Sequence, residues 1–198
     1  MSTLKENLEF SKKACDYVLK TKMIKGANWD QYSGTGNSYE ECISAGLPNK
    51  TCITRKDSID ICLYDKHRPS TRKKRTLLRG TMIDHLKVIA KEVETFGCGN
   101  CGEFSALAFM YLYEQKVRPL DWVQLEGADH MFVIIGRKAG KINNYKSWGS
   151  EAVICDPWGQ GFNKGNPLIG TYEGSDFVNK MKRLIPRFSG VEVVHREN

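Results

Sequence analysis

The sequence predicts an α+β fold, in which helices come first along the chain and antiparallel strands follow. Within 3–25 and 82–96, apolar residues recur with helical spacing, and 104–112 is almost entirely apolar. From about residue 120 they gather in short β-like runs separated by turn residues. The chain has 198 residues, 40% of them hydrophobic and 27% charged. This composition predicts a single domain over 1–198, and it excludes a wholly disordered or collagen-like chain.

Two amphipathic helices are expected before residue 97. Thr3 and Glu6 form a capping-box pattern, so a helix is predicted over 3–25 with Gly26 as its stop. The clearest amphipathic pattern covers 82–96. Its single apolar stripe consists of Met82, Leu86, Ile89, Val93 and Phe96.

A third helix follows directly, with Asn100 as its predicted N-cap and Glu103 as the capping-box partner. Nearly every residue from 104 to 112 is apolar, which is typical of a central buried helix, and Pro119 should end it. The segments that follow predict an antiparallel meander, a helix beginning near Ser175 and a last strand. The strand candidates are 122–126, 130–136, 152–155 and 191–194.

The cysteines and the N-terminal residues indicate the cellular compartment of the protein. The seven cysteines are an odd number and form no regular disulfide framework. The N-terminal residues lack the apolar core of a secretory signal, and no apolar run is long enough to span a membrane. We therefore expect reduced thiols, a cytosol-like compartment and no transmembrane segment.

A basic segment stands out at Lys66–Arg79, in a chain of net charge +7. It has two interpretations: a solvated loop, or a docking patch for an acidic partner, a lipid headgroup or a nucleic acid. The segment has no aromatic residue for base stacking, so the sequence gives no clear nucleic-acid site.

Cys101 is the predicted nucleophile, because it lies in the first turn of the buried helix after a glycine-rich approach. The helix dipole and unpaired N–H groups there favour a thiolate, and the same N–H groups can hold an oxyanion. Gly99 and Gly102 on either side would let a substrate approach closely.

His130 is the predicted base, since it begins the most apolar strand candidate beside the central helix. An ordinary packed histidine is the alternative interpretation. Asp156 ends the next strand candidate, and pairing of the two strands would let its carboxylate orient the imidazole. Asp156 could instead be a turn residue before Pro157. Asp129 competes for the orienting role, but neighbours on a strand point to opposite faces.

Three segments together resemble transglutaminase-like enzymes with the papain-like fold. They are Gly99-Asn100-Cys101-Gly102-Glu103, Asp129-His130-Met131-Phe132-Val133-Ile134 and Ile154-Cys155-Asp156-Pro157-Trp158, within about 82–160. The resemblance implies a Cys-His-Asp triad of Cys101, His130 and Asp156, with a central helix packed on an antiparallel sheet. It also implies kinship with translocated effectors of host-infecting bacteria, and hence a host protein as substrate in the host cytosol. Asn28, Gln31 and Gln160 are candidates for the oxyanion side chain.

The expected activity is acyl transfer from an amide through a Cys101 thioester, without a metal or organic cofactor. Glutamine deamidation or transglutamination of a protein is preferred, on the hypothesis that Trp122 and Trp158 wall a narrow channel; both indoles could instead be core residues. A cysteine protease of the same fold is the alternative. Cys98 and Cys101 also form a C-x-x-C pattern, which leaves a thiol-disulfide redox protein, a zinc site or a non-enzymatic binding module open.

Overall fold

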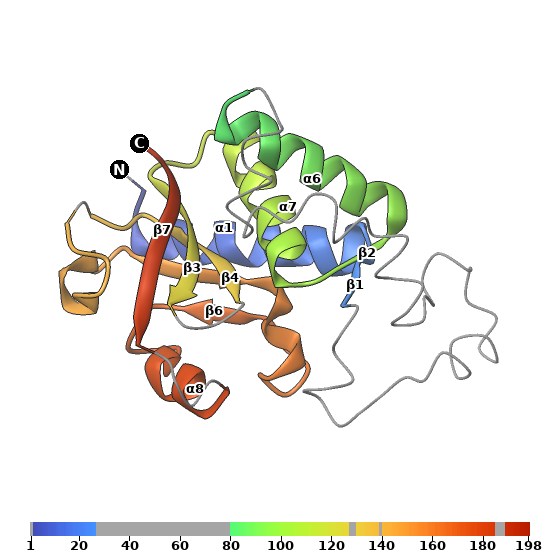
Figure 1. The fold of residues 1–198 in the computed structure, drawn as a ribbon. Helices are drawn as coiled ribbons and strands as arrows, with labels where there is room; N and C mark the ends of the chain where they lie inside the picture. The colour runs from blue at the N-terminus through green and yellow to red at the C-terminus, as the bar shows by residue number, and fades with distance from the viewer. Residues whose placement is uncertain (1, 27–79, 127–129, 139, 185–188) are drawn as a thin grey trace.

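The computed structural model describes residues 2–26, 80–126, 130–138, 140–184 and 189–198, and these form an α+β fold as predicted (Figure 1). The basic segment Lys66–Arg79 lies outside the described residues, so its two interpretations stay open.

A five-stranded antiparallel sheet forms the centre of the fold, in the order β6-β5-β4-β3-β7. All four predicted strand candidates are present in it, and β6 was not predicted. The strands are β3 (Leu120–Glu126), β4 (Met131–Ile135), β5 (Val153–Asp156), β6 (Leu168–Gly170) and β7 (Gly190–Glu197). β3, β4 and β5 are almost completely buried, which explains the continuous apolar sequence of β4 and the mostly apolar sequences of its two neighbours.

Helices cover both faces of this sheet. The larger core cluster joins one face to α1 (Leu4–Asp16), α6 (Met82–Phe96) and α7 (Cys101–Glu114) (Figure 1). On the other face, Phe177 and Met181 of α8 (Phe177–Leu184) join the second cluster, together with Trp148 of the 3-10 helix η2 (Tyr145–Trp148). Within the described residues, no helix has both the length and the apolar character needed to cross a membrane.

The two central helices agree with their sequence patterns. The α6 helix spans the predicted residues, and Thr81 and Asp84 cap its N-terminus. The α7 helix begins at Cys101 as expected, and its residues from Phe104 to Met110 are all buried. It ends at Glu114, before the proline expected to stop it, and Lys116 adopts a left-handed conformation with φ 59°.

The N-terminal helix ends earlier than predicted. After α1, a π-helical segment η1 (Tyr17–Thr21) follows, and Lys25–Gly26 form the short strand β1 instead of a helix end. The chain turns at Met23, whose φ is 53°, and the Ile24 N–H donates to the Val18 carbonyl. β1 then pairs in parallel with β2 (Cys98–Gly99). The helix prediction failed here because this pairing joins segments far apart in sequence.

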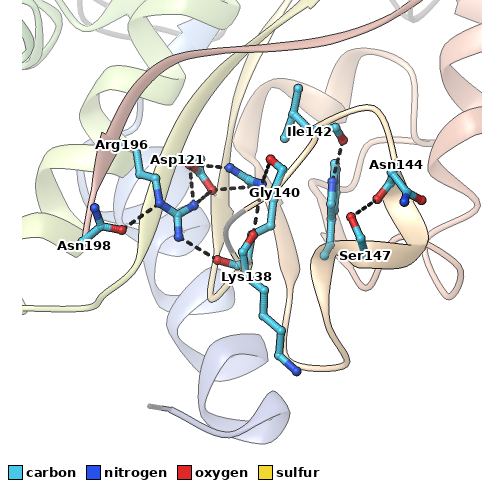
Figure 2. A network of polar contacts seen from close by, with 10 residues as sticks. Asp121, Lys138, Gly140, Ile142, Asn144, Ser147, Arg196 and Asn198 are labelled. Carbon is cyan, nitrogen blue, oxygen red and sulfur yellow. Dashed lines mark hydrogen bonds and ion pairs between the residues drawn. The ribbon is translucent and has the colours of Figure 1, made fainter.

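A buried ionic cluster fastens the C-terminal strand to the sheet (Figure 2). Asp121 of β3 is fully buried and pairs with the guanidinium groups of Arg137 and Arg196, at 2.8 Å in each case. Arg137 also donates to the Lys138 and Gly140 carbonyls. These contacts join β3, β7 and the chain that leaves β4, at the end of β4 opposite to His130.

Candidate functional site

Cys101 is held at the N-terminus of α7 by the chain reversal between α6 and α7. Gly97 ends α6 with a left-handed φ of 70°, and Glu103 accepts a 2.9 Å hydrogen bond from the Asn100 N–H. A Cβ on Gly99 would come within 2.6 Å of the Glu103 Cβ, so the close turn requires glycine there. The Cys101 residue is only 5% exposed.

The antiparallel pairing of β4 and β5 brings His130 and Asp156 together. His130 immediately precedes β4, and Asp156 is the last residue of β5. The His130 Nε2 atom lies 2.8 Å from Asp156 Oδ2, and both side chains are almost completely buried. The expectation that strand pairing places them within hydrogen-bond reach is therefore confirmed.

The second oxygen of the Asp156 carboxylate is also occupied. Oδ1 accepts a 3.1 Å hydrogen bond from the backbone N–H of Gly159, in the 3-10 helix η3 (Pro157–Gly161) that Asp156 caps. A Cβ on Gly159 would lie 2.6 Å from the Leu168 nitrogen, so glycine allows η3 to approach β6. Sequence reasoning missed Gly159; the Asp-Pro pair that initiates the turn was the available signal.

The protonation of His130 depends on two opposing effects. Burial is the largest single influence and lowers the pKa, but the Asp156 carboxylate and then Cys101 outweigh it and raise the pKa of His130 to about 10. The Nδ1 atom is buried and has no hydrogen bond of good geometry among the described residues. Since Nε2 is occupied by Asp156, Nδ1 is the ring nitrogen left to interact with the Cys101 thiol.

Aromatic side chains enclose the imidazole. Its centroid lies 5.2 Å from that of Trp158, 5.7 Å from Phe162 and 6.0 Å from Phe132. Trp158 thus packs against the candidate base. Trp122, by contrast, is fully buried, and its Nε1 donates to Ser105 Oγ at 2.8 Å, which agrees with the interpretation as a core residue. Phe162 was not singled out from the sequence, because nothing in its spacing links it to His130.

The described histidines other than His130 belong to different elements. His85 lies on α6, and His195 of β7 pairs with Glu197 at 2.7 Å. Gln160 belongs to η3, the helix that also contributes Trp158 and Gly159 to the site. The remaining candidates lie outside the described residues: Asn28, Gln31, His67 and Asp129.

The structure also bears on the redox and zinc interpretations. The segment directly before the C-x-x-C pattern is the α6 helix, which is capped by Gly97. In a thioredoxin-like site, a β-strand would directly precede this pattern. Cys15, Cys101 and Cys155 are thiols and form no disulfide. In the described part of the chain, no group of three or more His, Cys, Asp or Glu side chains is arranged to hold a metal ion.

Comparisons with protein-family models, with curated proteins and with solved structures give no match to this chain. A thiol at a helix N-terminus, a buried imidazole and a carboxylate fixed at both oxygens are the groups that nucleophilic acyl transfer requires.

Proposed function

We propose that this chain is a cysteine acyl-transfer enzyme of the papain-like, transglutaminase-like type. Cys101 is the nucleophile, His130 carries the proton, and Asp156 orients and charges His130. The observation that carries the proposal is the buried 2.8 Å contact between His130 and Asp156 beside Cys101. A buried imidazole with a strongly raised pKa beside a thiol is a combination that cysteine catalysis uses.

The raised pKa modifies the proton transfer expected from the sequence. Because the pKa of His130 is about 10, the ring is an imidazolium at neutral pH, and in this proposal Cys101 reacts as the thiolate paired with it. The thiolate attacks the amide carbonyl carbon, and N–H groups at the start of α7 stabilise the oxyanion. His130 then protonates the leaving nitrogen, and a thioester remains on Cys101. Water or an amine releases the acyl group, with His130 accepting the proton of the attacking molecule.

The preferred substrate is the side-chain carboxamide of a glutamine in a protein. Cys101 and His130 are 5% and 2% exposed, so a slender side chain reaches them more easily than an extended peptide backbone. Release to water would give deamidation, and release to a lysine would give a cross-link. Ammonia is the first product in both reactions.

The resemblance to effectors of host-infecting bacteria extends this proposal to the partner and the location. We propose a host-cell protein as substrate, met in the reducing host cytosol. The basic segment Lys66–Arg79 would contribute attraction to an acidic partner.

The proposal is tested by incubating the protein with a host-cell lysate and a fluorescent primary amine. We expect ammonia release and amine incorporation into glutamine residues, located by peptide mass spectrometry. Cys101→Ala should abolish both, while Cys98→Ser should retain them. New amino termini without ammonia would favour the cysteine protease instead. If Cys98→Ser were as inactive as Cys101→Ala, the redox interpretation would be preferred.

A further inference from the structure

Two cysteines outside the candidate triad face one another in the core. The Sγ atoms of Cys15, on α1, and Cys155, on β5, lie 3.8 Å apart, and both residues are completely buried. A disulfide bond measures about 2.05 Å, so the two sulfur atoms are in contact without being bonded. A movement of about 1 Å by each sulfur would bring them to bonding distance.

The surroundings hold the two sulfur atoms opposite one another. Asn7 and Ser11 lie eight and four residues before Cys15 on the same face of α1, and donate to the carbonyls of Glu151 and Ile154 at 2.8 and 3.1 Å. The Cys155 Sγ also contacts the Ser11 carbonyl at 3.7 Å. The helix is therefore fixed along β5 by contacts that lead directly to the thiol pair.

We propose that Cys15 and Cys155 are a site of reversible oxidation, at which a small peroxide converts the thiol pair into a disulfide. One sulfur, as thiolate, attacks a peroxide oxygen, so that the O–O bond breaks and a sulfenic acid and water form. The second thiol attacks the sulfenyl sulfur, the S–S bond forms, and a second water leaves with the proton. Overall, two thiols lose two electrons, and one hydrogen peroxide is reduced to two waters.

Burial makes this oxidation slow in the folded protein. Burial, and then the neighbouring Cys155, raise the pKa of the Cys15 thiol, which lowers its thiolate fraction. Peroxide reaches the pair only when α1 separates briefly from β5. The pair therefore responds to sustained oxidation rather than to a brief exposure.

The disulfide would connect α1 to β5 across a loop of about 140 residues. It would reduce the conformational entropy of the unfolded chain. Stability should rise for that reason. Because Cys155 precedes Asp156, the cross-link would also fix the strand end that carries the candidate orienting carboxylate.

The test uses the full chain as wild type and as Cys101→Ala, which removes oxidation of the candidate nucleophile. Each is treated with hydrogen peroxide, unfolded in the presence of a maleimide, and mapped by non-reducing peptide mass spectrometry. We expect a peptide joining Cys15 to Cys155 that a dithiol reductant removes. The melting temperature should rise by about 5–10 °C. Cys15→Ala, the matched control, should show neither change.

The proposal is overturned if both cysteines remain maleimide-reactive after peroxide treatment continued for many times the period that fully oxidises Cys101 in the wild type. It is also overturned if they become sulfinic acids without a cross-link, or if Cys155 pairs with a different cysteine. The peptide map of the wild type gives these results even if Cys15→Ala fails to fold.

Discussion

Asp156 and Gly159 are joined by a 3.1 Å hydrogen bond, in which the Gly159 N–H donates to Asp156 Oδ1. The other carboxylate oxygen lies 2.8 Å from His130 Nε2. Because both oxygens are engaged, the carboxylate cannot rotate without losing a partner. This arrangement fixes Nε2 as the nitrogen that donates to Asp156. It leaves Nδ1 as the nitrogen available for proton transfer with the Cys101 sulfur.

Asp156→Asn should change the protonation state of the His130 ring more than it changes the position of the ring. Gly159 N–H and His130 Nε2–H both donate, and an amide has a single acceptor oxygen. If that oxygen keeps Gly159, the amide donates to Nε2 and the ring proton moves to Nδ1, the wrong tautomer for a base. Loss of the charge also removes the main influence that raises the pKa of His130. We expect amide turnover to fall at least about a hundredfold.

The measurement is the pH dependence of Cys101 alkylation by iodoacetamide, followed together with amide turnover. Asp16→Asn is the matched control, since Asp16 lies on the surface of α1 and pairs with Lys20. It should keep the wild-type profile. An unchanged profile in Asp156→Asn would contradict the orienting role.

Removal of either reacting group should be more severe than any other single change in the site. Cys101→Ala should abolish turnover, and His130→Ala should lower it by orders of magnitude, because each is proposed to act in the transition state. Turnover on a substrate identified from the lysate, with circular dichroism to verify folding, provides the measurement. Substantial turnover in a folded Cys101→Ala variant would refute the nucleophile assignment.

Protein stability should depend on the His130 charge. Folding raises the pKa of His130 from its ordinary 6.5 to about 10. The contribution of the His130–Asp156 pair to stability is therefore complete below pH 6.5, declines as the pH rises, and is lost above about pH 10. The measurement is urea unfolding of the wild type and of His130→Gln across this pH range. The difference between their unfolding free energies should become smaller as the pH rises. A difference that stays constant or widens would rule out the charged pair.

Asp121→Asn should destabilise the fold without touching the candidate site. It leaves Arg137, whose side chain is 4% exposed, and Arg196 without their carboxylate partner. Breaking a buried ion pair in this way costs about 3–5 kcal/mol of unfolding free energy, measurable by urea titration. The control is Glu9→Gln, which removes an exposed i,i+4 pair with Lys13 and should change stability little. Equal effects of the two substitutions would show that the buried cluster is not stabilising.

Residue patterns in the sequence were sufficient to predict the central helices and strands. The stripe in α6, the apolar sequence of α7 and the short runs of β3, β4 and β5 are local features, determined by side chains a few positions apart. Since strands that follow one another along the chain usually pair, the approach of His130 to Asp156 was also predictable.

Contacts between distant segments decided the rest. The chain after α1 pairs as β1 with β2, and the close approach of η3 to β6 requires glycine at 159. The contact between Cys15 and Cys155 likewise requires α1 to lie along β5. The sequence by itself determined which residues favour helix and which favour strand, and it indicated Cys101 as the candidate nucleophile. The tertiary structure decided which of their atoms meet, because such contacts depend on strand register and helix docking, and these are set by packing across the whole core.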